Sequence, residues 1–355
     1  MSELLLPRER VALALERKTP DRVPVDFWSV SEVMDNLMRR FNTHVSEDVY
    51  RALGIDLRIF GPDYIGPPLR TLPDGSYYGP MGDHRKKVGN RFSVYDEMAS
   101  YPVGDAATID DLEKFEYWPN PDHYDYAGLS DKIGDMHERY YIKLYTGGIF
   151  ELAWELRGLE QFYLDMALDP EIAYYIMGRY ADFYSEYIRR SLEAAGDKYD
   201  IVYTYDDIAS QRGPLMSGDM WRRLVRPHHE KVDGVIKSFG KKVMYHSCGA
   251  VYDIIDDLIT LPIDILNPIQ PAADGMDLAK LKKNYGGRLC FHGGMDIQWL
   301  LPHGTKTDVE ASVAHTVDTL GKGGGYILAS AHALQNDTPV ENIVAMYDAA
   351  RNYRY

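Results

Sequence analysis

The sequence predicts an α/β fold, a single (β/α)8 TIM barrel that spans residues 1–355, and two observations support this prediction. From residue 142 onward, short runs of β-branched and aromatic residues alternate with helical stretches, which is the pattern of a parallel sheet built from βα units. With two more runs near the N-terminus, the strand candidates number eight, the strand count of this barrel. No internal repeat or linker divides the chain, so we expect one domain.

The expected strands and helices follow one another along the chain. The strand candidates are residues 23–28, 56–64, 142–148, 201–207, 242–248, 264–270, 288–294 and 325–332. Helices are expected after Asp169–Pro170, from about Ser217, and at residues 250–260, 277–286 and 308–321. Ser217 and Asp308 are suitable N-caps, which supports the starts of two of these helices.

A long segment between the second and third expected strands has a different composition. Residues 65–125 are rich in glycine, proline and tyrosine, and they account for the excess over the ~250 residues of a typical barrel. We expect turns and hairpins here, inserted after the second strand. Long insertions at the C-terminal face of a barrel often cover the active site, so this segment is a candidate lid.

Composition and charge exclude several classes of protein. No apolar run approaches the roughly 18 residues that span a bilayer, and the charged start has no signal-cleavage site, so we expect a cytoplasmic protein without a membrane partner. The net charge of −15, with no basic stripe, argues against nucleic acid as a partner. Only two cysteines, Cys248 and Cys290, are present, which argues against a disulfide scaffold.

The stretch "MYHSCG" (244–249) holds the first candidate for a metal site. His246 and Cys248 are two residues apart on an expected strand, so they point to the same side, and they fall at its C-terminal end, where barrel enzymes build their sites. Imidazole and thiolate are both good zinc ligands. A third donor must come from another strand, and the candidates are Cys290, His292 and His332.

Other polar residues follow the ends of the remaining strands and complete a ring around the barrel mouth. The adjacent carboxylates Asp206 and Asp207 point to opposite faces of a strand, so one can enter the mouth while the other caps or braces a loop. A carboxylate there could take a proton, bind a cationic group or orient a metal-bound histidine. We expect catalytic roles for Asp206, Asp207 and Asp63, and substrate-binding roles for Glu151, Glu155, Gln211, Asn267, Gln270 and His292.

Along nearly its whole length, the chain resembles the uroporphyrinogen decarboxylase superfamily. The resemblance rests on ordered segments: "RVALALERKTPDRVPV" (10–25), "DPEIAYYIMGRYADFY" (169–184), "YDDIASQRGPLMS" (205–217), "HSCG" (246–249), residues 266–305 and residues 323–351. It implies the TIM-barrel fold. The superfamily contains porphyrinogen decarboxylases, which need no metal, and corrinoid-dependent methyltransferases, which hold zinc through a His-x-Cys pair and a distant third ligand.

Within the superfamily, the chain is more similar to the methyltransferase branch. Decarboxylases carry an arginine-rich segment after the first strand, but here "VPVDFW" is followed by no arginine until Arg39. In this resemblance, Glu155 replaces a decarboxylase tyrosine. His246 and Cys248 match the methyltransferase pair, and His332 occupies the position of its third zinc ligand, although decarboxylases also place a histidine there. If His332 does not bind zinc, a mouth carboxylate such as Glu151 or Asp206 could.

The resemblance therefore implies a zinc-dependent methyltransferase that moves a methyl group between a small O-methyl or N-methyl compound and a corrinoid. The chain shows no corrinoid-binding motif, so the corrinoid is expected on a separate partner protein. One alternative is a metal-independent decarboxylase that acts through Asp63 and His332. Another is a non-enzymatic module that binds a corrinoid protein. A homodimer is possible, and the methyl donor, the methyl acceptor and the direction of transfer stay open.

Overall fold

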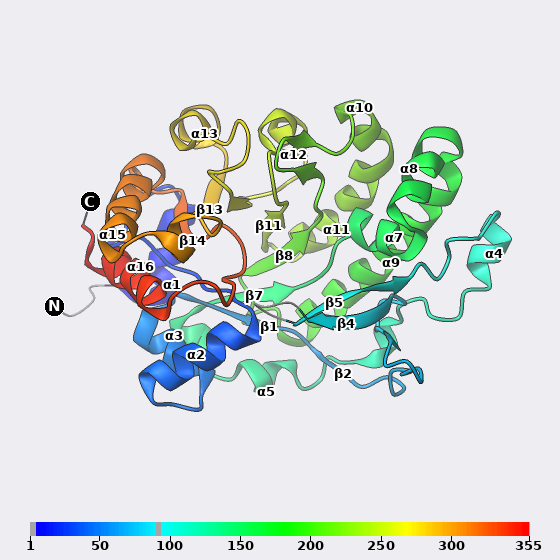
Figure 1. Cartoon of the computed structure of the whole chain (residues 1–355), viewed down its shortest axis with the longest axis horizontal. Helices are drawn as coiled ribbons and strands as arrows, with labels where there is room; N and C mark the ends of the chain where they lie inside the picture. Colours follow the sequence, from blue (N-terminus) through cyan, green and yellow to red (C-terminus); the bar gives the residue numbers. More distant parts are fainter. Residues whose placement is uncertain (1–4, 90–93, 355) are drawn as a thin grey trace.

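The protein is described by a computed structural model that covers residues 5–89 and 94–354. At its centre lies a sheet of seven parallel strands, in the order β1, β7, β8, β11, β12, β13, β14, with helices packed around it (Figure 1). The strands are β1 (Leu57–Phe60), β7 (Tyr141–Tyr145), β8 (Ile201–Tyr205), β11 (Lys242–His246), β12 (Ile265–Ile269), β13 (Cys290–Met295) and β14 (Tyr326–Ser330). The TIM-barrel-like fold is thus confirmed.

The predicted first strand, residues 23–28, would be the eighth strand of the barrel. In the structure it forms only a short β-bridge. Val25 pairs with Leu328 of β14, and its carbonyl accepts the N–H of Asp56, directly before β1, at 2.9 Å. The N–H of Asp26 in turn donates to the carbonyl of Leu328 at 3.0 Å. Pro24 has no N–H to give to a ladder, which is a physical reason why this segment forms no full strand. It nevertheless connects the two edge strands of the sheet.

The helices include the long amphipathic α9, which begins at Pro170 as predicted. The predicted N-cap Ser217 accepts the N–H of Met220 at 3.1 Å, but the N-cap of α15 is Thr305, and Asp308 is its partner three residues later. The helices are α1 (Pro7–Leu15), α2 (Ser31–Phe41), α3 (Ser46–Leu53), α4 (Ile109–Glu113), α5 (Leu129–Ile133), α6 (Met136–Arg139), α7 (Phe150–Arg157), α8 (Leu159–Leu168), α9 (Pro170–Ala195), α10 (Gly218–Met220), α11 (Arg226–Ser238), α12 (Ile255–Leu258), α13 (Leu278–Tyr285), α14 (Leu300–His303), α15 (Lys306–Thr316) and α16 (Val340–Asn352).

The inward side chains of the strands form an apolar layer below a polar one. The lower layer consists of Leu57, Tyr141, Ile201, Met244, Ile265, Cys290 and Ile327, and Val11 and Leu15 of α1 pack against it. Two residues further along their strands, His246, Asn267 and His292 form part of the polar layer. Cys290 shares the face of His292, as predicted, but it lies in the apolar layer, where burial raises its pKa to about 12.

The segment that was predicted as a lid begins and ends at a short antiparallel pair, β2 (Asp63–Tyr64) with β6 (Tyr124–Asp125). Within it, β3 (Tyr77–Tyr78), β4 (His84–Gly89) and β5 (Val94–Ser100) form an antiparallel sheet. Arg85 of β4 forms an ion pair with Glu155 of α7, and the hydroxyl of Tyr95 donates to Gln335 Oε1 at 2.5 Å. The sheet is therefore attached both to α7 and to the segment after β14. Its role as a lid stays a prediction.

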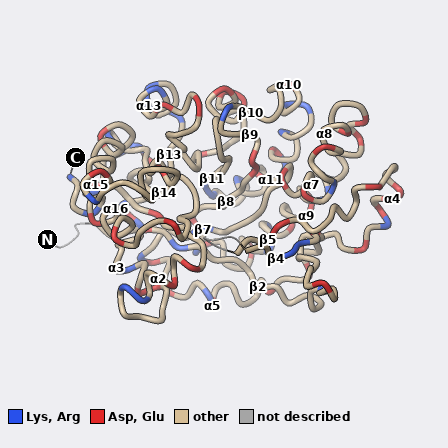
Figure 2. The backbone as a smooth tube through the Cα atoms, viewed as in Figure 1, with Lys and Arg blue, Asp and Glu red and all other residues tan. Residues whose placement is uncertain are grey.

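Among the described helices, none combines the length and apolar character needed to cross a membrane. Basic and acidic residues are interspersed over the backbone in Figure 2. This distribution agrees with the absence of a basic stripe in the sequence.

Candidate active site

A pocket of about 410 Å³ opens at the C-terminal ends of the strands. Aromatic side chains form part of its wall: the ring of Trp28 contacts that of His246, and Tyr145 stacks with Tyr203 and Tyr205. The polar residues that line it are Asp26, Lys143, Glu151, Asp207, His246, Asn267, His292 and His332. This is the position at which barrel enzymes assemble catalytic groups.

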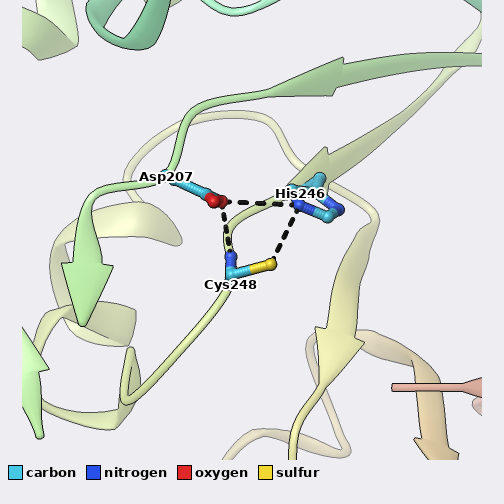
Figure 3. A group of neighbouring side chains, drawn as sticks. All are labelled: Asp207, His246 and Cys248. Carbon is cyan, nitrogen blue, oxygen red and sulfur yellow. Dashed lines mark hydrogen bonds and ion pairs between the residues drawn. The ribbon is translucent and has the colours of Figure 1, made fainter. Parts of the chain in front are cut away.

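Asp207, His246 and Cys248 converge at this pocket and are the one group in the described part of the chain whose potential ligand atoms all lie within 4.8 Å of one another. His246 Nε2 lies 3.4 Å from Cys248 Sγ and 3.4 Å from Asp207 Oδ1. The N–H of Cys248 donates to Asp207 Oδ1 at 2.8 Å, which holds the carboxylate over the loop (Figure 3). Two strand ends, those of β8 and β11, thus supply nitrogen, sulfur and oxygen donors to one point.

The charges of this group suit a divalent cation. Burial and the neighbouring Asp207 and Glu151 raise the pKa of the Cys248 thiol far above its ordinary value. Burial also acts to raise the pKa of Asp207, but the hydrogen bond from the Cys248 N–H opposes it, and the pKa is lowered, so the carboxylate is ionised. Imidazole, thiolate and carboxylate are all zinc ligands, and three protein ligands are what a catalytic zinc site uses. The donor set fits zinc, and binding would displace the thiol proton.

His332, the predicted third ligand, is not part of this group, although its ring lies beside that of His246. Its ring centroid is 6.3 Å from that of His246 and 5.2 Å from that of Trp28. Burial lowers its pKa, so the imidazole is neutral near pH 7. The geometry favours Asp207 over His332 and Cys290 as the third donor, and a direct ligand role for His332 stays a prediction.

Asp206 turns away from the pocket and supports helix α7. Its carboxylate accepts the N–H groups of Ile149, Phe150 and Glu151 at 2.9–3.0 Å, and it lies 2.6 Å from His229 Nε2. Negative charge at a helix N-terminus is stabilising, and these contacts occupy both carboxylate oxygens. The structure therefore places Asp206 in the scaffold, and it does not bring this predicted catalytic residue to the pocket.

Two further predicted residues lie outside the pocket lining. Asp63 is exposed and forms an ion pair with Lys132 at 2.6 Å, because it belongs to the short strand β2 at the base of the insertion. Glu155 is paired with Arg85 of the insertion, and burial raises its pKa. Glu151 does line the pocket, where burial and the carboxylates around it, Asp207 first, raise its pKa to about 8.

Gln270 braces the loops that carry the pocket residues. Its Oε1 accepts the N–H of Gly249 at 2.9 Å and the Gln211 amide at 2.8 Å, while its Nε2 donates to the carbonyl of Ala331 at 3.1 Å. Gly249 has φ +88°, and a Cβ there would lie 2.4 Å from the carbonyl oxygen of Ser210, so glycine is required directly after Cys248. Gln211 and Gln270 thus connect the loops after β8, β11 and β14.

Asn267 and His292 line the pocket as predicted, and both belong to a hydrogen-bonded row behind His246. The row continues to Asp26 and Lys143, which the sequence analysis did not single out. A lysine inside the β-run "IKLY" (142–145) was the available signal, because a buried charge requires a partner. The partner lies on the bridging segment 24–26, more than a hundred positions away in the chain.

Comparisons with known proteins decide the family. Residues 105–353, more than half of the chain, match the family described as uroporphyrinogen decarboxylase (URO-D). The chain belongs to this family. The resemblance stated from the sequence motifs is thereby confirmed for the URO-D family as a whole. None of the curated proteins matches the chain.

Solved structures show the fold of this URO-D family member. It is similar to a methyltransferase from Methanosarcina mazei, with a TM-score of 0.67, 19% sequence identity and coverage of 98% of both chains. It is also weakly similar to dispersin B, with a TM-score of 0.41, 10% identity and coverage of 95% of this chain and 99% of that one. At 19% identity, the likeness to the methyltransferase concerns the fold.

Proposed function

We propose that this URO-D family protein is a zinc-dependent methyltransferase that moves a methyl group between a small methylated compound and a corrinoid held by a partner protein. The observation that carries the proposal is the convergence of Asp207, His246 and Cys248 at the mouth of the barrel. The whole-length similarity to a methyltransferase of the same fold supports it. The two metal donors that the sequence motif predicted lie together, with a carboxylate as the third.

The protein's own residues would hold the metal and manage a proton. His246, Cys248 and Asp207 would bind zinc, and bound zinc would supply Lewis acidity to the heteroatom that carries or receives the methyl group. Glu151 lines the same pocket, and its pKa of about 8 keeps the carboxyl largely protonated at neutral pH. It can give that proton to the heteroatom from which a methyl group leaves.

The chemistry of the pocket favours a small substrate with little negative charge. Its volume of about 410 Å³ lies at the small end of ligand pockets. Among the residues that the structure describes, no arginine lines it, and its lysine, Lys143, is already paired with Asp26. A polycarboxylate such as a porphyrinogen would meet the ionised Asp207, and the described lining offers it no unpaired cation, which weighs against the decarboxylase alternative.

The first experiment measures zinc content and methyl transfer together. We expect about one zinc per purified chain and transfer of methyl groups to cobalamin from a member of a panel of methoxylated compounds and methylamines. Cys248→Ala and His246→Ala should each lose the zinc and the transfer. Cys290→Ala is the matched control, because Cys290 is the chain's other thiol and lies in the apolar layer, and it should keep both.

Other outcomes would support the alternatives. Activity on carboxylated substrates that survives Cys248→Ala and depends on His332 would indicate the metal-independent decarboxylase. Tight binding of a corrinoid protein without methyl transfer from any tested donor would indicate a binding module. Absence of zinc from protein prepared with zinc present would overturn the proposal.

A further inference from the structure

Behind His246 lies a row of buried side chains, Asn267, His292 and Asp26, which we call the relay. These three side chains and His246 are between 1% and 6% exposed, so their polar atoms depend on one another for hydrogen bonds. They come from β12, β13 and the bridging segment, and they meet only because the barrel closes. The chemistry of each group decides which atom donates and which accepts.

The proton positions can be worked out from the Asp26 end. Burial acts to raise the pKa of Asp26, but Lys143 and His292 outweigh it and hold the pKa well below its ordinary value, so the carboxylate can only accept. His292 Nε2 lies 2.9 Å from Asp26 Oδ2 and must therefore carry a proton. Burial lowers the pKa of His292, so the ring is neutral and its Nδ1 has only a lone pair to offer.

The Asn267 amide then determines which nitrogen of His246 carries hydrogen. Its Nδ2 lies 2.5 Å from His292 Nδ1 and donates to it, which turns the amide Oδ1 toward His246. That oxygen lies 2.7 Å from His246 Nδ1 and can only accept, so Nδ1 carries the proton. Tyr203 Oη, also 2.7 Å from Nδ1, is a second oxygen beside the same N–H.

We propose that Asp26, His292 and Asn267 are positioning residues that hold His246 in the tautomer with hydrogen on Nδ1. The Nε2 lone pair then points at the Cys248 and Asp207 side chains, 3.4 Å from the nearest ligand atom of each. An imidazole without such partners exchanges its proton between both nitrogens, and a protonated Nε2 cannot bind a metal. The inference rests on the metal-binding part of the proposed function, and it does not depend on methyl transfer.

The position of Cys248 agrees with this arrangement. Its Sγ lies 3.4 Å from His246 Nε2, so the sulfur and the Nε2 lone pair face the same point, where a metal ion would bind both. The relay therefore directs the Nε2 lone pair toward the metal-binding point already in the metal-free protein.

The test compares two buried asparagines. Asn267→Leu removes the acceptor for His246 Nδ1, and Asn342→Leu is the matched control, since the Asn342 amide donates to the carbonyls of Leu301 and Gly304 away from the pocket. Nitrogen NMR of metal-free, 15N-histidine-labelled protein reports the tautomer of His246, and chelator competition reports Zn2+ affinity. We expect Asn267→Leu to mix the tautomers and weaken Zn2+ binding by about 10- to 100-fold. Asn342→Leu should change neither.

Two further variants separate positioning from a merely structural role. Asn267→Asp keeps an acceptor for His246 Nδ1 and should restore the tautomer and most of the affinity, and it also serves if Asn267→Leu fails to fold. The His292 side chain contacts no ligand atom of the group, yet His292→Leu should also weaken Zn2+ binding. If the relay acts as one unit, the double variant Asn267→Leu/His292→Leu should be no worse than Asn267→Leu alone.

The relay is overturned if His246 in the metal-free wild type carries hydrogen on Nε2, alone or on both nitrogens. It is also overturned if Asn267→Leu binds Zn2+ as tightly as Asn342→Leu. Because neither readout uses a methyl donor, a protein with an intact relay that transfers no methyl group would contradict only the proposed function.

Discussion

Asp206 and Asp207 are neighbours in the chain directly after β8, yet they have opposite surroundings. Asp206 accepts the N–H groups at the start of α7 and pairs with His229, whereas Asp207 faces His246 and Cys248. At the residue scale, strand parity therefore predicts that one carboxylate enters the pocket and the other does not. It does not predict which, because that depends on where α7 begins.

Substitution of each carboxylate should separate stability from metal binding. Asp206→Ala leaves three N–H groups and His229 without their acceptor, so we expect a loss of about 3–5 kcal/mol in the free energy of unfolding, measured with urea. Asp207→Ala should weaken Zn2+ binding strongly, with a much smaller loss of stability. A change of under about 1 kcal/mol for Asp206→Ala would contradict its scaffold role.

At the element scale, the inserted sheet of β3, β4 and β5 connects structures on different sides of the pocket. Arg85 attaches it to Glu155 of α7, and Tyr95 attaches it to Gln335, three residues after His332. Composition predicted turns and hairpins in this segment. The attachment points were beyond prediction, because side-chain contacts between distant segments depend on the finished barrel.

Removal of the Tyr95 hydroxyl should loosen the insertion. A hydrogen bond of this kind contributes about 1 kcal/mol, so Tyr95→Phe should speed hydrogen exchange of the β5 amides about fivefold, as measured by mass spectrometry. Tyr353→Phe is the control, because the Tyr353 hydroxyl contacts Asp318 far from β5 in the chain. Equal exchange of β5 in both variants would show that Tyr95 does not secure the insertion.

At the scale of the whole molecule, the two ends of the barrel differ in chemistry. At the lower end, Asp56 accepts from Arg10 at 2.6 Å and from Arg22 at 2.8 Å, and all three side chains are buried. Both arginines belong to the "RVALALERKTPDRVPV" motif, so this part of the family resemblance secures the fold. The upper end holds the polar groups of the pocket, among them Asp207 and His246.

Zinc should therefore stabilise the entire fold, and more so at higher pH. At a free concentration of about 1,000 times Kd, one site adds about 4 kcal/mol to the free energy of unfolding. Because the pKa of Cys248 is raised, binding releases its proton, and affinity should rise about tenfold per pH unit between pH 7 and 9. Thermal unfolding with and without zinc measures both effects.

The control for this prediction is again the pair of cysteine variants. Cys248→Ala should lose the zinc-dependent stabilisation and its pH dependence, and Cys290→Ala should keep them. Stabilisation that levels off above about pH 8.5 would mean that the thiol ionises in its ordinary range.

The sequence by itself determined the features that depend on local periodicity. Alternating strands and helices predicted the barrel, and the two-residue spacing of His246 and Cys248 predicted that they share a face. Only the tertiary structure decided which carboxylate joins them, that His332 lies beside His246 but outside this group, and that Asp26 reaches His246 through two intervening side chains. The physical reason is that side-chain direction along a strand has a fixed period, whereas contacts across a barrel depend on how the sheet closes.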